Sequence, residues 1–584
     1  MTKRQFQVLY RDFLFRLVDR DLLSAHAEGD ASKLLGQFIT VLILLGVGLT
    51  LLVLGIPNGR VPRAIVFVAA WNAEHTLIAT TMLVIGLFAV LSWDSTFPDR
   101  RDVLVLAPLP VRASTIFFAK VASLAAALSL TVIAVNALPS FVLIYAVAPP
   151  DYNIFQVLLS PASYRILFAH WVTMLAAAAF LFCCILFAQG LAAQLSRRLF
   201  LRISSFLQMT ALCLFIGVYF LQPSLTTPQA LADPGNQSLL TWLPSYWFLG
   251  IFQELNGSPG PARSALAALA TRAWIGFACA LAGAGVAYVL SYFRTLRKIV
   301  EQPDILPGPR RLTWLPRFGN SLETAVVQFS IRTLFRSRQH RLILSFYSGV
   351  GFAILILFLK TPIVHVLASK SAAHGWQQVS LPLLASSFVM MCFWALGIRA
   401  VFALPLELQA NWIFRLTAVH GTMDYLAASR RSMFALIALP VWLASVAIFL
   451  ALWPWRPAIE HLAVLGLLGI ALTELCLYGF HKIPFTCSYL PGKSNFHIKF
   501  WLFLMLGLNI IFQAADFERS ALPDPSKYAL IIVVLCIAAF GARWRTQAHA
   551  NSDESRLQFE DEWSPVILGL GLRRDGTLPL EPLP

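Results

Sequence analysis

Apolar runs of roughly 20 residues alternate with polar stretches along almost the whole chain. The runs fall near 35–55, 73–93, 114–147, 163–193, 203–222, 273–293, 342–360, 380–404, 433–453, 461–480, 500–515 and 528–544. A helix rises 1.5 Å per residue, so about 20 apolar residues cross a hydrocarbon core of about 30 Å. The pattern predicts an all-α polytopic membrane protein with about twelve transmembrane helices. The run at 114–147 is too long for one perpendicular crossing and contains Asn136 and Pro139, so we expect a kink or a partly re-entrant end there.

A long polar centre divides the runs into two sets of six. An amphipathic, basic segment precedes each set, at 7–18 and at 329–341, and its spacing predicts a helix lying in the membrane interface. We therefore expect five parts: a first interfacial segment (1–34), a first six-helix half (35–293), a linker with a second interfacial segment (294–341), a second six-helix half (342–544) and a tail (545–584). Two related six-helix halves are the economical interpretation.

Composition and charge fit this class and exclude others. Hydrophobic residues make up 58% of the chain and charged residues 13%, which excludes an ordinary soluble enzyme and a disordered protein. The net charge of +16 comes without an aromatic-interleaved basic patch or zinc-finger spacing, so no nucleic-acid partner is expected. With a cytoplasmic N-terminus, the inner segments carry 33 Lys and Arg and the outer loops carry ten. The positive-inside rule then predicts a plasma (inner) membrane protein with both termini cytoplasmic.

A search for catalytic, cofactor and metal chemistry finds no site. The eight cysteines form no CxxC pair and the histidines have no metal-ligand spacing. The segment 491–494 reads PGKS, but Cys487 stands where a phosphate-binding loop requires glycine. We expect no enzyme activity, no cofactor and no metal in this chain.

Four ionisable side chains lie within the predicted spans and are candidates for function. They are Glu474, Arg399, Lys120 and His170. We expect Glu474 to pair with Arg399 or His481 as a structural bridge, with a proton relay as the alternative. His170 is expected to make an interhelical hydrogen bond. The aromatic segment 242–252, in the outer stretch 223–270, is expected to lie in the interface, with substrate contact as the alternative.

The loop between the second and third runs carries the most distinctive pattern. Its charged, apolar and proline residues predict a short helix over about 101–107 that is ended by prolines. The apolar face of this helix should be covered either by a partner protein or by the inner ends of the chain's own helices. The residues concerned are Asp99, Arg100, Arg101, Asp102, Val103, Leu104, Leu106, Pro108 and Pro110.

The stretch from Arg101 to Lys120, RDVLVLAPLPVRASTIFFAK, resembles the D-x-x-L-L-x-x-L-P-V signature of export-type ABC transporter permeases. The resemblance implies that this loop is a coupling helix docking on a separate ATP-binding subunit, and that the interfacial segments are elbow helices. The loop of the second half reads AVHG at 418–421 and departs from the signature.

Three function classes remain open at this stage. The leading one is the transmembrane permease subunit of an ATP-driven exporter, with a separate ATPase, the lipid bilayer and an unknown transported substrate as partners. The alternatives are an ion-coupled secondary transporter, which shares the two-halved layout, and a membrane-embedded transferase. The transferase ranks last because the outer stretch 223–270 contains Asp233 and Glu254 but no histidine.

Overall fold

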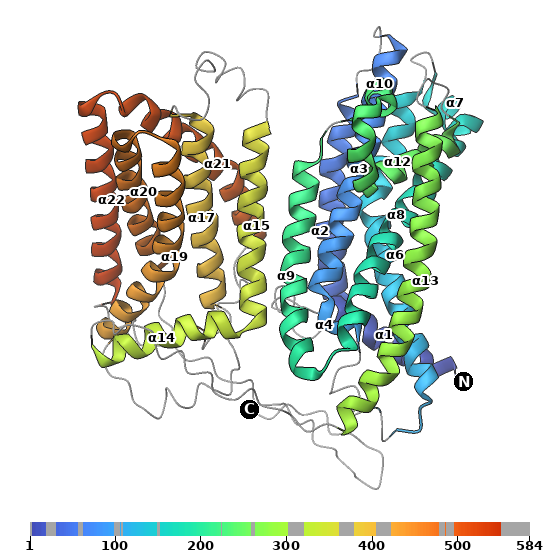
Figure 1. Cartoon of the computed structure of the whole chain (residues 1–584), viewed down its shortest axis with the longest axis horizontal. Coiled ribbons are helices and arrows are strands. Elements are labelled where there is room, and N and C mark those ends of the chain that lie inside the picture. Colours follow the sequence, from blue (N-terminus) through green and yellow to red (C-terminus); the bar gives the residue numbers. More distant parts are fainter. Residues whose placement is uncertain are drawn as a thin grey trace, which may run out of the picture.

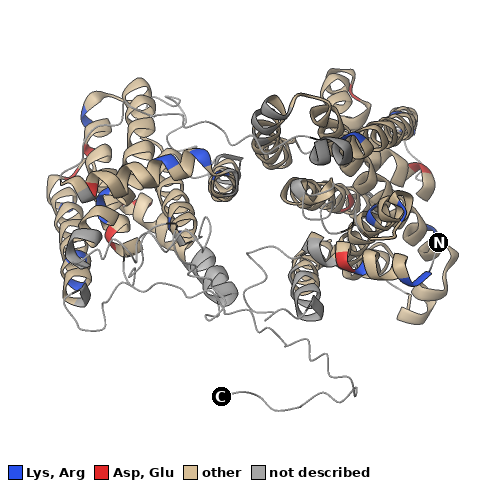
Figure 2. Cartoon of the chain, turned by 90° about the horizontal axis from the view of Figure 1, so that it is seen from below, with Lys and Arg blue, Asp and Glu red and all other residues tan. Residues whose placement is uncertain are grey.

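The two groups of helices in this chain lie side by side (Figures 1 and 2). A computed structural model describes residues 3–18, 31–56, 62–97, 106, 109–148, 152–223, 225–257, 263–301, 320–360, 379–403, 422–477, 485 and 496–550. All regular secondary structure within these ranges is helical, which confirms the predicted all-α class.

The first group surrounds one apolar core, built mainly from five of its long helices and from the short helix at Pro244–Asn256. Its helices are α1 (Lys3–Val18), α2 (Ala31–Leu54), α3 (Arg63–Leu91), α4 (Trp93–Thr96), α6 (Ala113–Val147), α7 (Ile154–Leu159), α8 (Pro161–Ala193), α9 (Arg197–Leu221), α10 (Pro228–Ala232), η2 (Pro234–Asn236), α11 (Gln237–Trp242), α12 (Pro244–Asn256) and α13 (Arg263–Glu301).

The second group has a core of its own, which shares no residue with the first. Its helices are α14 (Ser321–Arg336), α15 (Arg338–Lys360), α17 (Leu381–Ala403), α19 (Thr422–Leu452), α20 (Trp455–Leu477), α21 (Phe496–Ala521) and α22 (Pro525–Ala550). The groups meet where α9 packs against α15, around Leu212, Ile216 and Ala353.

Eight helices in the described ranges are long and apolar enough to cross a membrane: α3, α6, α8, α13, α17, α19, α20 and α22. Counting the bent pair α14–α15 as one span raises the number to nine. The chain is therefore a helical, membrane-embedded protein. Helices also occupy the other predicted runs, but α2 and α9 contribute only the shorter apolar stretches Leu42–Leu54 and Phe206–Leu221. The count of twelve spans in two halves stays a prediction.

The 35-residue helix α6 runs without interruption through Pro139, so the expected re-entrant end is not found. Asn136, one turn earlier, is fully buried and is tied to Thr81 of α3 by hydrogen bonds of 3.0 and 3.2 Å. This packing holds the helix on both sides of the proline, which removes only one backbone hydrogen bond.

Segment 242–252 packs inside the first group for most of its length, and its expected interfacial depth stays a prediction. Although Trp242 is 84% exposed, the following helix α12 is buried among α3, α8 and α13. Its Gly250 lies directly against α13, where a Cβ atom would stand 2.7 Å from the Leu266 carbonyl oxygen. Aromatic residues occur both at membrane interfaces and in tightly packed cores. Gly250 allows α12 to approach α13 closely, and α12 is therefore part of the core of the first group.

Both segments that were expected to lie in the interface are helical. α14 is amphipathic and meets α15 at 80°, so it runs across the end of the second group rather than along it (Figure 1). α1 packs against α6 at the same end of the molecule (Figure 1). Figure 2 views this end and shows charged residues on both groups. The predicted five-part division of the chain is compatible with these helices but is not tested by them.

Candidate functional site

A buried acid–histidine pair joins two long helices of the first group. His170 Nδ1 of α8 lies 3.0 and 3.1 Å from the two carboxylate oxygens of Glu74 on α3, and both residues are fully buried. The predicted interhelical hydrogen bond of His170 is thus confirmed. His170 Nε2 is buried and makes no hydrogen bond within the described part of the chain.

A second polar chain runs beside this pair toward the end of α9. His75 Nε2 lies 3.1 Å from the Ser245 hydroxyl of α12, which donates a 3.1 Å hydrogen bond to Gln222 Oε1. The ring of Tyr246 stacks on His75 at 4.0 Å between centroids. Three polar residues and a tyrosine therefore link α3, α12 and the end of α9 inside an otherwise apolar core.

The second group contains its own buried acid–histidine pair, extended by a serine. His461 Nδ1 of α20 lies 2.9 Å from Glu518 Oε1 of α21, and His461 Nε2 lies 3.0 Å from the Ser387 hydroxyl of α17. His461 is 0% exposed and Glu518 is 1% exposed. The rings of Phe449 and Trp453 on the α19 side approach the imidazole at 4.6 and 5.9 Å between centroids.

Two further buried carboxylates, at the other end of the second group, pair with arginine instead. Glu474 Oε1 of α20 lies 2.6 Å from Arg430 Nε of α19, and Glu323 of α14 pairs with the neighbouring Arg431. The expected structural bridge at Glu474 exists, but its partner is Arg430. The partner predicted on α17, Arg399, is half-buried, and His481 lies outside the described residues.

The start of α6 carries the corresponding cation in the first group. Lys120 is buried, and its Nζ stands 4.6 Å from the centre of the Phe13 ring of α1. In each group, a cation near the beginning of α6 or α19 therefore contacts the amphipathic helix that runs beneath it.

Only the end of the loop expected to couple to an ATPase is described. Leu106 is half-buried against Leu9 and Phe13 of α1, and Pro110 is exposed. Seven of the nine predicted coupling residues lie outside the described residues: Asp99, Arg100, Arg101, Asp102, Val103, Leu104 and Pro108. Leu106 thus packs on α1 of its own chain, while the partner contact of the loop stays a prediction.

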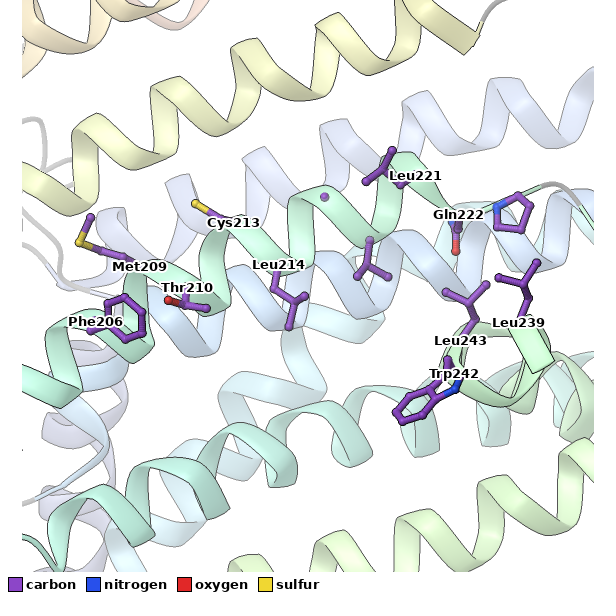
Figure 3. A pocket seen from close by; sticks show the side chains of 13 residues that line it. Phe206, Met209, Thr210, Cys213, Leu214, Leu221, Gln222, Leu239, Trp242 and Leu243 are labelled. Atoms are coloured by element: carbon purple, nitrogen blue, oxygen red, sulfur yellow. The ribbon is translucent and has the colours of Figure 1, made fainter. Parts of the chain in front are cut away.

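An apolar groove of about 750 Å³ follows one face of α9 toward α11 (Figure 3). It runs from Phe206 along the helix to Leu221 and ends at Trp242 and Leu243. The groove has no buried charge of its own and suits a hydrocarbon chain rather than a polar substrate. The described residues also contain no group of three metal-ligating side chains.

No family model matches the chain, and neither a curated protein nor a solved structure is similar enough to identify a relative.

Sequence reasoning found His170 and Glu474 but missed Glu74 and Glu518. Each missed glutamate lies near the predicted outer end of an apolar run, Glu74 next to His75 and Glu518 two positions after Asp516, where it resembles an ordinary helix-end charge. The partners are separated by 96 and 57 positions in the chain, so only the packing of helices brings them together. The one available signal was an acid and a histidine at similar predicted depth in different runs.

Proposed function

We propose that this chain is the transmembrane permease subunit of an ATP-driven exporter that works with a separate ATP-binding chain. Its twelve helices would form two six-helix halves in the plasma membrane, with both termini in the cytoplasm. The export-type permease resemblance of 101–120 and the 33-to-10 charge split support this assignment.

One observation carries the proposal beyond the sequence pattern. An amphipathic helix lies at the predicted cytoplasmic end of each group and is held by a cation on the third long helix that follows it in the chain. The contacts are Lys120 with Phe13 in the first group and Arg431 with Glu323 in the second. A transport subunit driven from the cytoplasm needs this kind of mechanical link between its interfacial helices and its spans.

The loop 99–110 is the proposed contact for the ATPase. It leads directly into α6, and its residue Leu106 packs on α1 together with Val111 and Ile116. A displacement of the loop would therefore move α1 and the start of α6 together. Because α6 crosses the first group beside α2, α3 and α8, the displacement would reach its core.

Co-expression with a candidate ATP-binding protein, sought first in the neighbouring reading frames, tests this proposal. We expect the two chains to co-purify and to hydrolyse ATP together, and Leu104→Asp to reduce co-purification at least tenfold at unchanged expression. The matched control is Leu159→Asp, since Leu159 is 72% exposed at the opposite end of the group. Co-purification that Leu104→Asp does not weaken would contradict the coupling role, and a chain that transports without any ATPase would contradict the whole proposal.

The buried Glu–His pairs favour one other candidate, an ion-coupled secondary transporter. Ionisable side chains inside membrane helices mark proton and ion pathways in such proteins. In that case transport by the purified chain in vesicles would follow an imposed proton gradient without ATP.

A further inference from the structure

The buried carboxylates in the described part of the chain fall into two chemical classes. Glu323 and Glu474 pair with arginine at one end of the second group, whereas Glu74 and Glu518 pair with histidine toward the other end. Arginine keeps its proton at any accessible pH, so an Arg–Glu pair is a permanent bridge. Imidazole and carboxylate can each bind or release a proton, so a His–Glu pair can hold a proton that leaves.

We propose that Glu518, His461 and Ser387 form a proton-binding site. One proton is held between the carboxyl and the imidazole while the outer ends of α20 and α21 are closed, and it exchanges with solvent when those ends part. The site goes beyond the proposed function, since an ATP-driven permease does not require it. Only the naming of the outer side rests on the proposed orientation.

Charge balance explains why a single proton belongs to the closed state. With one proton, the pair is neutral overall, whether as carboxylate with imidazolium or as carboxylic acid with imidazole. Within the described residues Glu518 contacts no lysine or arginine, and its one ion pair is with His461. Losing the proton would leave a bare carboxylate, and gaining another would leave a bare imidazolium. A bare charge in a buried site costs several kcal/mol.

Unused hydrogen-bonding atoms point to the same site. Glu518 Oε2 and Trp453 Nε1 are both buried and have no hydrogen-bond partner within the described part of the chain. Trp453 is 4% exposed and stands over the imidazole of His461. A purely structural pair would be expected to satisfy these atoms, since each unsatisfied buried group costs about 1–3 kcal/mol. An acid that has to take up and release a proton keeps one oxygen available.

The position of the pair gives it a short route to solvent. Glu518 lies in the last turn of α21, and its carbonyl oxygen accepts a 2.9 Å hydrogen bond from the Leu522 amide in the turn to α22. His461 lies less than two turns from the beginning of α20. A small separation of these two helix ends would expose both groups, whereas Ser387 of α17 closes the inner side.

Other titratable groups surround the site, and among them Tyr528 is close enough to Glu518 to interact with its charge. On α20, Glu460 pairs with Arg456 at 3.2 Å, and the Tyr528 hydroxyl of α22 donates to the Glu460 carbonyl oxygen. Asp516 and Arg519 flank Glu518 on α21 and are exposed and half-buried, respectively. The exposed pair of Asp524 with Lys527 lies at the start of α22. The faces of α17 and α19 contribute Ser387, Phe388, Phe449 and Trp453, which carry no charge.

Distance measurements between spin labels test the site in the full chain. The labels are placed at Ile459 on α20 and Ser520 on α21, both exposed, after the exposed cysteines are replaced by serine, and the protein is kept in lipid nanodiscs. In the wild-type protein we expect the closed distance to dominate near neutral pH and to be lost in alkali. If one proton leaves on opening, the ratio of open to closed rises about tenfold per pH unit.

Two variants separate proton binding from a structural role. Glu518→Gln accepts the imidazole hydrogen bond without a charge, so it should stay closed in alkali. His461→Gln cannot share the proton, so it should close only in acid. Glu460→Gln, one position away and more exposed, should retain the wild-type profile.

A wild-type distance that does not change with pH would overturn the proposal, even if a variant fails to fold. An alkaline opening that persists unchanged in Glu518→Gln would overturn it as well. Neither measurement involves an ATPase or a transported substrate, so failure of the proton site and failure of the permease proposal give separate results.

Discussion

At the residue scale, the ion pairs of this chain differ in how much free energy of unfolding should be lost when one partner is removed, because some are buried and others are exposed. The side chains of Arg430 and Glu474 are 17% and 4% exposed, whereas that of Arg456, which pairs with Glu460, is 71% exposed. Removing one partner of a buried pair leaves an uncompensated charge, while an exposed pair competes with water.

We therefore predict that Glu474→Leu lowers the free energy of unfolding by about 3 kcal/mol. Adding Arg430→Met should restore most of this loss, because the double variant buries no charge. Arg456→Ala should cost less than about 1 kcal/mol. Unfolding by SDS titration from mixed micelles, followed by helical circular dichroism, measures all three, and equal losses for Glu474→Leu and Arg456→Ala would show that the buried pair is not special.

The sequence locates these residues better than it pairs them. Isolated charges in apolar runs stand out, so Glu474, Arg399, Lys120 and His170 could be selected without a structure. The partner of Glu474 could not, since several basic residues lie at the same predicted depth and the choice depends on how α19 packs on α20. From a single sequence one can estimate how far along a helix a residue lies. One cannot tell which face of that helix packs against which neighbouring helix.

At the element scale, α12 depends on a close contact with α13. A Cβ atom on Gly250 would lie 2.7 Å from the Leu266 carbonyl oxygen and 2.8 Å from the Ala270 amide nitrogen, both of which are backbone atoms. A backbone cannot rotate away as a side chain can. The two helices would have to separate to accommodate any larger residue.

Gly250→Leu is accordingly predicted to destabilise the first group by at least about 2 kcal/mol, because overpacking forces the backbone to shift. Gly285→Leu is the matched control, since Gly285 lies on α13 with no heavy atom within 4 Å of its Cβ position. Thermal unfolding of both variants in the same detergent provides the comparison. Similar melting temperatures would mean that α12 does not pack as tightly as its distances indicate.

Elements were predicted with uneven success for a physical reason. The long apolar runs and the two amphipathic segments are helices, because length and periodicity determine them locally. The burial of α12 among other helices was not predicted, because a short aromatic helix has no local property that separates a covered position from an exposed one. For Leu106 the sequence left two alternatives open, a partner or its own helices, and only the packing of α1 shows that it contacts the second.

At the scale of the whole molecule, the contact between α9 and α15 is the junction of the two groups. A Cβ atom on Gly349 of α15 would lie 2.7 Å from Ile216 Cδ1 of α9. Cysteines at these two positions should therefore come close enough to form a disulfide.

We predict that the pair Ile216→Cys and Gly349→Cys cross-links in native membranes under mild oxidation, in a chain whose other cysteines are serine. A protease site is inserted between α13 and α14 and cleaved after oxidation. On a non-reducing gel, the two fragments then migrate together only if the disulfide has formed. Gly217→Cys with Gly349→Cys is the control, since the Gly217 Cβ position has no neighbour within 4 Å. Cross-linking of the control as strong as that of the test pair would contradict the specific packing of α9 on α15.

The separation of the two cores also has a consequence for biosynthesis. Every helix of the first group has been translated when Glu301 is reached, with nearly half of the chain still to come. Of this remainder, α15 is complete at Lys360, which at about 5–20 residues per second takes roughly 3 to 12 s after Glu301. During that interval the face of α9 that will receive α15 is covered by lipid, and the later arrival of α15 has to displace those lipids. The rate-limiting step in maturation would then be an exchange of lipid for helix, sensitive to the lipid composition of the membrane in which the ribosome delivers the chain.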